Sequence, residues 1–580
     1  MQSLRLCSAL CFALLQLYTV ACRECAVNDY GAAGDGLTID TNAIQRAIDR
    51  CSDGGAVLFS ERSVYLVAGS LTIVGSGIEL VIPRTTILRC VLHHDRSNSA
   101  AWAMLHMVQC SGCGIRGGGT LEGPRAVEQV QSSPDPALRS GVGGSSRGRP
   151  AVPLPGAGHA PEPSVPPTLL MIERCSQVVV LDLRVVELPA VGVLVDSSAD
   201  VVLQRVTVRS DWFTPGTSGV VVDGSRRVTV TECDVLTADD AVLLRTSSSG
   251  SSLQDFVLTA STLQSRSSAV RVGSEVHADI TRVLVADITV RPSHRGLAVQ
   301  LRDSGSIRDV TFRRVQLETR HDDPRWWGAA EPIHISSLPR ALFTNLGKVC
   351  NISFYDVACT SCEGGVMLAG APDSYLSGVR LGNVNITMVQ ATSVYGGYRD
   401  LRPGLLGVVD MTVPPFYARY LTHLSLSRVL LELTRPPRME WRGLLRTMTS
   451  TVGAVDVHDL RVVDDAALPH RWEDLEPSVS NRAPHGNNHE ADACRPIAWY
   501  RTWVCRVLHR WGQLGSGHLA VAFRYVPESL RRGCGEAIAQ AELTAAQQRW
   551  DELDDTERDL RQHPRYASHV ARSRLGERKN

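Results

Sequence analysis

Two adjacent carboxylates, Asp239 and Asp240, have the type and spacing that most directly suggest chemistry. They stand in LTADDAVLL, where a short polar turn separates two apolar runs, so both side chains can project from one bend toward a cleft. Like charges at close range favour a protonated carboxyl beside an ionised one, which is what general acid and base catalysis needs. The simpler alternative is a loop pair that caps backbone amides.

A repeat supplies the elements that must position this turn. Octads rich in Val, Leu and Ile begin at 178, 201, 228, 256, 283 and 310, with spacings of 23, 27, 28, 27 and 27 residues, and recur at 352, 379 and 424. Apolar residues two apart indicate strands that bury one face, and a unit this short must stack on its neighbours. The repeat predicts an all-β fold, a right-handed parallel β-helix that advances about 4.8 Å per coil. A leucine-rich horseshoe would need a Leu ladder, and a propeller would need longer blades.

The segment 27–51 predicts a strand, a glycine turn and a helix that covers the open end of the solenoid. Thr41 is expected to cap this helix, and Ile44, Ala47 and Ile48 are expected to form its apolar stripe.

Residues 1–22 predict a secretory signal peptide, because Arg5 precedes an apolar run that ends in small side chains near Ala21. An uncleaved signal anchor is the alternative. We therefore expect a secreted protein, extracellular or in a cell wall, that has no membrane contact after cleavage. Lysine plus arginine equals aspartate plus glutamate, 60 against 60, so no net charge recruits nucleic acid. A monomer is expected.

The remaining chain divides by composition. Residues 23–463 are expected to form the β-helix, interrupted at 124–167 by a flexible insertion rich in Pro, Gly and Ser. Residues 464–493 are expected to be a linker, and 494–580 a partly helical extension to which the sequence assigns no function.

Cysteines and sequons are consistent with an oxidising compartment. Cys25 and Cys51 are the preferred disulfide, and Cys359 and Cys362 close a tight loop or bond elsewhere. CSGC at 110–113 lacks a second pair of ligands at metal spacing, so no zinc site is predicted. The sequons at Asn351 and Asn385 predict glycosylation.

The segment 27–51 resembles the opening of glycoside hydrolase family 28, the polygalacturonase-like enzymes, and of related pectin lyase-like β-helices. GTSGVVVDGSRRVTVTECDVLTADDAVLLRTSS at 216–248 is similar to that family's Asn-Thr-Asp-Gly and Gly-Asp-Asp region. SAVRVGSE at 268–275, the segment 295–312 and RWWGAAEPIHISSLPR at 325–340 also resemble family segments in the same order. The resemblance covers about residues 24–463 apart from the insertion.

The resemblance implies that Asp239 is a general acid and Asp240 a general base. Ser218 stands where the family has a third aspartate, and the family's histidine falls at Ser267 or Ser268. Its Arg-Ile-Lys clamp falls at Ala298, Val299 and Gln300, so the catalytic motif is degenerate.

Further residues are candidates for substrate binding. Counted from the octad starts, Asp240, Ser268 and Arg295 share one offset, so a column of stacked residues is expected. It would place Arg295 about two coil spacings, roughly 10 Å, from the carboxylates, where it can bind an acidic sugar. Trp326, Trp327 and Glu331 could wall a subsite. A solvated arginine and ordinary loop packing are the alternatives.

These expectations combine into one hypothesis and one rival. The hypothesis is a hydrolase that cleaves a pectin-like or other polysaccharide containing uronic acid or rhamnose, by an inverting mechanism, and that requires no metal or organic cofactor. The rival is a catalytically inactive β-helix that binds glycan, and it is motivated by Ser218, Ser267 and Gln300. The substrate-binding candidates in full are Arg295, Gln300, Trp326, Trp327, Glu331, Ser218 and Ser267.

Overall fold

The computed structural model describes residues 23–91, 102–124, 167–341, 344–394, 398–404, 407–410, 414–434, 446–447, 455–464 and 470–471. The predicted signal peptide, the interior of the insertion, most of the linker and the extension lie outside these ranges. The chain divides into two compact units. Unit 1 runs to Val242 and includes Asp255–Leu263, and unit 2 comprises Leu243–Gln254 and the residues from Gln264 onward.

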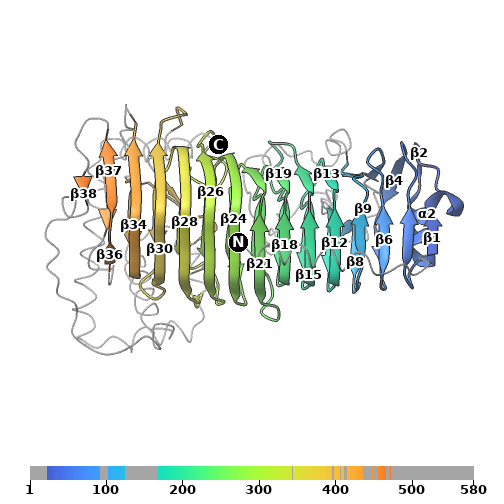
Figure 1. Ribbon diagram of the computed structural model, residues 1–580, viewed down its shortest axis with the longest axis horizontal. Helices are drawn as coiled ribbons and strands as arrows, with labels where there is room; N and C mark the ends of the chain where they lie inside the picture. Colours follow the sequence, from blue (N-terminus) through green and yellow to red (C-terminus); the bar gives the residue numbers. More distant parts are fainter. Residues whose placement is uncertain are drawn as a thin grey trace, which may run out of the picture. The chain divides into compact units, whose positions relative to one another are not determined.

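Unit 1 is built from coils of three short parallel strands, which stack into three columns (Figure 1). The first column contains β1 (Arg23–Ala26), β3 (Gly55–Leu58), β6 (Ile78–Val81), β9 (Gly114–Arg116), β12 (Ser176–Leu181), β15 (Ala199–Gln204) and β18 (Arg226–Thr231). The second contains β2 (Asp35–Ile39), β4 (Val64–Ala68), β7 (Ile87–Val91), β10 (Thr120–Glu122), β13 (Arg184–Val186), β16 (Thr207–Arg209) and β19 (Asp234–Thr237). The third contains β5 (Leu71–Ile73), β8 (Ala103–Val108), β11 (Thr168–Glu173), β14 (Val193–Asp196) and β17 (Val220–Asp223).

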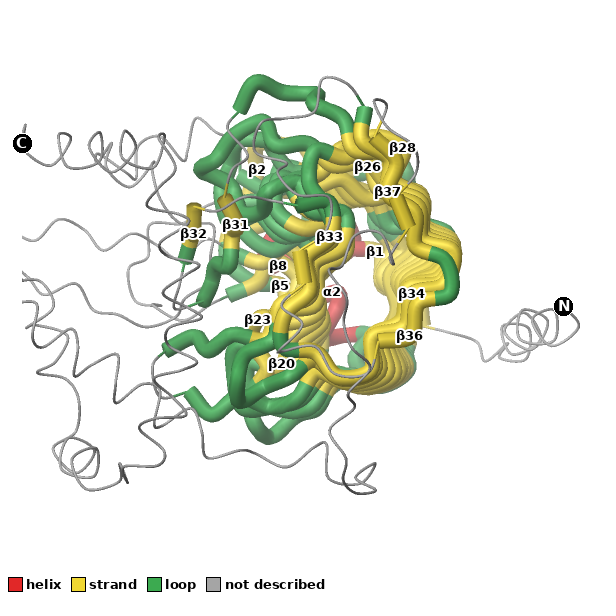
Figure 2. Tube along the Cα trace, turned by 90° about the vertical axis from the view of Figure 1, so that its left-hand side faces the viewer, coloured by secondary structure: helices red, strands yellow, loops and turns green. Residues whose placement is uncertain are grey.

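Unit 2 repeats the arrangement with longer strands. One parallel stack contains β24 (Ile280–Ser293), β26 (Ile307–Thr319), β28 (Val349–Cys362), β30 (Leu376–Met388) and β34 (Leu421–Leu433). The other contains β23 (Ser268–Val276), β25 (Arg295–Leu301), β27 (Ile333–Ser337), β29 (Val366–Ala369) and β33 (Phe416–Arg419). Figure 2 looks along the coils and shows strands of one stack lying behind one another. The predicted parallel β-helix is confirmed.

The octads align as the repeat predicts. Val178 pairs with Val201 and Val201 with Val228 in unit 1, and the starts at 283, 310, 352, 379 and 424 pair in the same way in unit 2. The expected simple alternation needs one correction, because the fifth residue of every octad has a left-handed backbone, with φ between 49° at Ala260 and 60° at Asp182. This bend shifts the phase, so that positions one, three, six and eight are buried, as in Val178, Val180, Leu183 and Val185.

The N-terminal helix α2 (Thr41–Arg50) buries Ile44, Ala47 and Ile48, as predicted. The predicted cap at Thr41 is wrong. Asp40 is the N-cap residue, and its carboxylate instead accepts hydrogen bonds from the backbone amides of the preceding glycine turn. Thr41 is the first helical residue, and its hydroxyl exchanges hydrogen bonds with the backbone of Ala68.

The described part of the chain contains two disulfides, Cys25–Cys51, which was the preferred pairing, and Cys359–Cys362. Among the residues that the structure describes, no helix is long and apolar enough to cross a membrane.

Candidate active site

The acidic turn of unit 1 lies between β19 and β20 (Val242–Thr246) and is bonded to the coil before it. The Asp239 amide donates to the Thr217 carbonyl at 3.2 Å, and the Gly219 amide donates to the Asp240 carbonyl at 2.9 Å. These two bonds bracket Ser218, so Ser218 lies beside the carboxylate pair. The alignment suggested by the family motif therefore corresponds to real neighbours in the structure.

Serine and threonine hydroxyls hold this turn in place. Ser210 accepts hydrogen bonds from the Thr217 hydroxyl at 3.0 Å and from the Ala238 amide at 3.1 Å, while the Thr237 hydroxyl donates to the Asp239 carbonyl at 2.8 Å. Asp239 keeps 7% of its surface exposed, whereas Asp240 is fully buried. Both aspartates are therefore buried, and Asp239 is the one that keeps a small exposed fraction.

One step of the predicted column, from Ser268 to Arg295, is present in unit 2. Ser268 on β23 pairs with Arg295 on β25, and the Arg295 amide donates to the Ser267 carbonyl at 2.8 Å. All three side chains are buried. The resemblance placed a histidine at this point, and the structure places only short hydroxyl side chains there.

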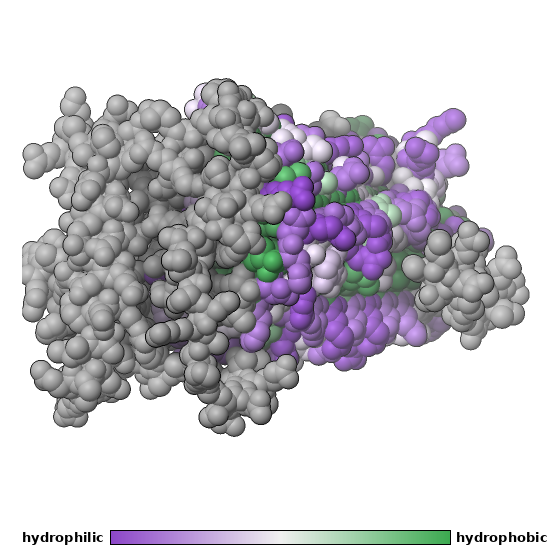
Figure 3. Space-filling model, turned by 60° about the vertical axis from the view of Figure 1, so that its left-hand side comes forward, coloured by the Kyte–Doolittle hydropathy of each residue, from purple (hydrophilic) through white to green (hydrophobic). Residues whose placement is uncertain are grey.

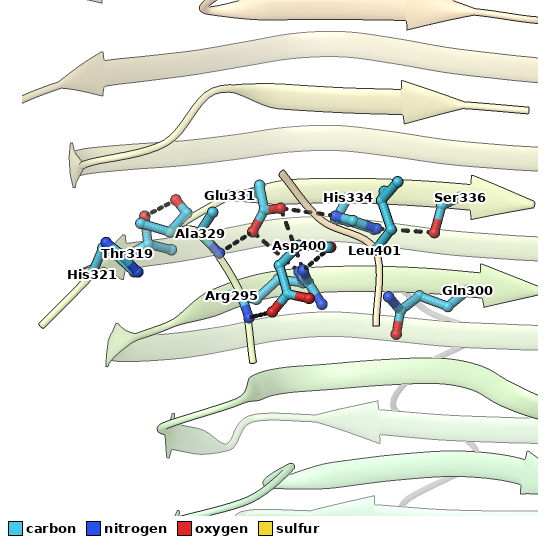
Figure 4. Close-up of polar contacts among 12 residues, drawn as sticks. Arg295, Gln300, Thr319, His321, Ala329, Glu331, His334, Ser336, Asp400 and Leu401 are labelled. Atoms are coloured by element: carbon cyan, nitrogen blue, oxygen red, sulfur yellow. Dashed lines mark hydrogen bonds and ion pairs between the residues drawn. The ribbon is translucent and has the colours of Figure 1, made fainter. Parts of the chain in front are cut away.

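Arg295 is held by a buried carboxylate rather than by solvent. Its guanidinium donates to both carboxylate oxygens of Glu331, at 3.2 and 3.3 Å, and to the backbone carbonyl of Asp400 at 2.9 Å (Figure 4). Arg295 is fully buried and Glu331 is 4% exposed. A charge can be buried when it is paired with an opposite charge and makes further hydrogen bonds, and both side chains meet these conditions.

Glu331 also anchors a hydrogen-bond chain along β27. His334 and Ser336 are two residues apart, so their side chains share one face of the strand. His334 Nδ1 lies 3.1 Å from Glu331, and its Nε2 lies 2.9 Å from the Ser336 hydroxyl. A carboxylate only accepts, so Nδ1 carries the proton and Nε2 accepts from Ser336. Arg302 in turn donates to the Ser336 hydroxyl at 2.9 Å.

The charges of this network displace its pKa values. Burial raises the pKa of Glu331, but Arg295 and His334 outweigh it and hold that pKa well below the ordinary value. Burial, followed by the charge of Arg295, lowers the pKa of His334 to about 4. Burial and the neighbouring arginines, Arg295 first, lower the pKa of Arg302 to about 9. The network at neutral pH thus contains ionised Glu331 and neutral His334.

Gln300 occupies the position where the family has a lysine. Its side chain is buried on β25, and its amide nitrogen lies 3.4 Å from the Arg402 carbonyl. Buried positive charge is still present in unit 2, at Arg302 and at Arg271, neither of which the sequence pattern had marked as a substitute.

Trp326 and Trp327 are 9% and 7% exposed. The guanidinium of Arg266 lies 4.7 Å from the ring centre of Trp326, and that of Arg271 lies 5.4 Å from the ring centre of Trp327. One face of each ring is thus in contact with a cation. Glu275 pairs with Arg245 at 3.1 Å.

Sequence reasoning missed Arg302, His334, Asp400 and Arg402. The spacing of His334 and Ser336 in β27 (Ile333–Ser337) is a usable signal, because alternate residues of a strand share a face. Asp400 has no such signal, since 105 residues separate it from Arg295. The described ranges contain no group of three or more His, Cys, Asp or Glu side chains that could hold a metal ion. The predicted glycosylation sites Asn351 and Asn385 are exposed.

Comparison with known proteins gives concordant matches. Residues 154–396 match the model of Glycosyl hydrolases family 28. A polygalacturonase of Persea americana is 23% identical over 63% of this chain and 74% of its own length, and a "Probable polygalacturonase" of Vitis vinifera is 22% identical over 64% and 76%. The solved structure of a Yersinia enterocolitica family 28 exopolygalacturonase has a TM-score of 0.54 at 16% identity and covers 75% of this chain and 78% of its own, which shows the shared fold.

The stacked coils and the match to the solved structure define the class of fold, which is a parallel β-helix. Residues 154–396 are similar to glycosyl hydrolases family 28, and the similar curated proteins are polygalacturonases.

Proposed function

We propose that the protein is a secreted hydrolase that cleaves a pectin-like polysaccharide, or a related glycan containing uronic acid or rhamnose, with inversion at the anomeric carbon. The observation that supports this most directly is the acidic turn of unit 1, in which Asp239 keeps 7% of its surface exposed beside Ser218. Secretion is supported by the features of residues 1–22 and by the Cys25–Cys51 disulfide.

Asp239 is the proposed general acid. It gives its proton to the glycosidic oxygen as the bond to the anomeric carbon breaks. Asp240 is the proposed base, which takes a proton from the water that attacks the opposite face of the sugar. Because Asp240 is fully buried in the structure, this step requires its carboxylate to become accessible when substrate binds.

Ser218 provides a hydroxyl where a third carboxylate would otherwise lie. A hydroxyl can hydrogen-bond to a sugar or a water molecule, but it cannot act as an ionised base. The proposal therefore gives both proton transfers to the aspartate pair and gives Ser218 a binding role.

Substrate binding by residues of unit 2 is a separate proposal. The candidates remain Arg295, Gln300, Trp326, Trp327, Glu331 and Ser267. Since Glu331 holds Arg295 through two bonds, we expect Arg295 to contribute positive charge from beneath the surface rather than a free guanidinium.

The test is release of reducing sugar from homogalacturonan and from rhamnose-containing pectic fragments. Asp239→Asn is expected to lower the rate at least 100-fold, the scale of general acid catalysis. Asp182→Asn, at an exposed bend of the same unit, is the matched control and is expected to retain the wild-type rate. Ser218→Asp is expected to raise the rate by restoring a third carboxylate. Proton NMR of the first product is expected to show the inverted anomer.

Equal release by wild type and Asp239→Asn would remove the assigned acid. Binding of these fragments without any cleavage would identify a glycan-binding β-helix instead of a hydrolase.

A further inference from the structure

Three cysteines that the proposed hydrolysis does not use converge in unit 1. Cys110 and Cys113 lie between β8 and β9, and Cys175 lies between β11 and β12. β8 and β11 pair in register, with Val108 opposite Glu173, so Cys110 and Cys175 hold equivalent positions in adjacent coils. All three are buried, at 2%, 2% and 3% exposure.

Cys110 and Cys175 belong to a ladder of small polar side chains at this corner of the coils. The Cys110 amide donates to Cys175 Sγ at 3.3 Å, the Cys175 amide donates to the Ser198 hydroxyl at 2.9 Å, and the Ser198 amide donates to the Ser225 hydroxyl at 2.9 Å. Serine performs this task in the later coils. Hydrogen bonding therefore does not explain why two consecutive positions of the ladder are cysteine.

The spacing of the ladder suits a disulfide. Residues in register on neighbouring parallel strands are about 4.8 Å apart, which falls within the Cα separation of about 4.4–6.8 Å that disulfides span. The two side chains point the same way, because each sulfur contacts a carbonyl of the preceding coil, Cys110 that of Ile73 at 2.9 Å and Cys175 that of Met107 at 3.4 Å.

Cys113 is the third member. Its sulfur lies near the carbonyls of Gly75 and Ser111, at 3.8 and 3.7 Å, and the Cys110 thiol interacts with the sulfurs of both Cys113 and Cys175. That interaction with Cys110, opposed by burial, lowers the pKa of Cys113 to about 7. Cys110 is therefore the central sulfur, with one sulfur partner in its own corner and one in the adjacent coil.

We propose that Cys110, Cys113 and Cys175 form a covalent thiol–disulfide site, in which Cys110 is oxidised to a disulfide with Cys175 and Cys113 is the exchanging thiol. In the oxidation, two thiols lose two protons and two electrons to a small-molecule or protein disulfide, which becomes two thiols. In the exchange, the Cys113 thiolate attacks Cys110 Sγ, a Cys110–Cys113 bond forms, and Cys175 leaves as a thiolate. Because the three side chains are buried, the oxidation takes place while the chain folds.

The position of the proposed Cys110–Cys175 disulfide indicates a structural role. Cys110 and Cys175 are 65 residues apart, and the segment between them includes the insertion at 124–167. A crosslink there closes the coil on both sides of that insertion and restricts the unfolded chain.

The experiment maps disulfides in the full chain made through an oxidising secretory route. The protein is denatured in acid with a maleimide, digested without reduction and analysed by mass spectrometry. We expect the peptide that starts at Cys175 to be linked to the peptide that contains Cys110 and Cys113, and Cys25–Cys51 serves as the internal positive control.

Serine variants assign the central sulfur. Cys113→Ser is expected to keep the link to Cys175, Cys175→Ser is expected to yield Cys110–Cys113, and Cys110→Ser is expected to leave both remaining thiols alkylated. Cys233→Ser is the matched control, because Cys233 has the same kind of ladder contact, to Ser261, and is expected to leave the pattern unchanged. The proposal is overturned if all three thiols are alkylated in wild-type protein whose Cys25–Cys51 bond is intact. A Cys113–Cys175 bond in Cys110→Ser also contradicts it.

Discussion

At the scale of single residues, Glu331 holds the buried network of unit 2 together. It accepts from Arg295, from His334 and from the Ala329 amide at 2.8 Å. Each of these donors is buried or partly buried and would lose its acceptor if the carboxylate were removed. Breaking a buried ion pair from one side is costly because a charge is left without compensation.

Glu331→Gln is therefore expected to lower the free energy of unfolding of unit 2 by about 3–5 kcal/mol. Asp287→Asn removes one charge from the exposed Arg314–Asp287 pair of the same unit, and it is expected to cost about 0–1 kcal/mol. Urea denaturation of both variants and wild type measures the difference. Equal losses in the two variants would show that Glu331 does not hold this network.

At the scale of elements, the left-handed bend in each octad links the conformation of one coil to the next. Bend residues of adjacent coils pair across the surface, as Arg205 does with Asp182 and Arg314 does with Asp287. Figure 3 shows rows of hydrophilic residues on the face that it presents. Most bends carry a polar residue, but Ala260 offers neither a partner side chain nor an easy left-handed backbone, with φ at 49°.

Ala260→Gly is expected to stabilise unit 1 by about 0.5–1 kcal/mol, because glycine adopts this conformation without the Cβ clash. Ala358→Gly, in the body of β28, should do the opposite by a similar amount, because glycine there only adds freedom to the unfolded chain. Thermal denaturation compares the melting temperatures of the two variants with that of wild type. A lower melting temperature for Ala260→Gly would mean that its bend is not strained.

At the scale of the molecule, acid should weaken the protein in a defined range of pH. The pKa of His334 is about 4 in the folded chain and 6.5 ordinarily, so the unfolded chain binds the proton first as pH falls. The stability that neutral His334 contributes is complete above pH 6.5 and is lost as pH falls toward 4. The lowered pKa of Glu331 acts in the same direction, but below pH 4.5.

The urea concentration at the denaturation midpoint of wild type is accordingly expected to decrease as the pH is lowered from 6.5 to 4. His334→Gln is expected to make this decrease smaller. Measuring urea midpoints at half-unit steps of pH tests this. Parallel curves for the two proteins would exclude His334 as the source.

The sequence predicted the coils well because their determinants are local and repeated. Apolar residues at fixed octad positions set the register, and every aligned start from Val283 to Leu424 pairs as expected. The bend was not predicted, since charged residues such as Arg205 and Asp287 take the left-handed form without a glycine. The aspartate pair was found because its segment resembles the family's Gly-Asp-Asp region. The burial of the pair was not predicted, because the exposure of a side chain depends on the coils that surround it.

The strands before and after the insertion are both paired with neighbouring coils. β10 ends at Glu122 in register with Val186, and β11 starts at Thr168, whose amide donates to the Trp102 carbonyl at 2.9 Å. The end of β10 and the start of β11 are thus each fixed by hydrogen bonds to adjacent coils, whatever the sequence of the insertion between them. A connection of this kind tolerates insertions of very different length. The insertion could therefore be replaced, in evolution or by design, without loss of the β-helix that flanks it.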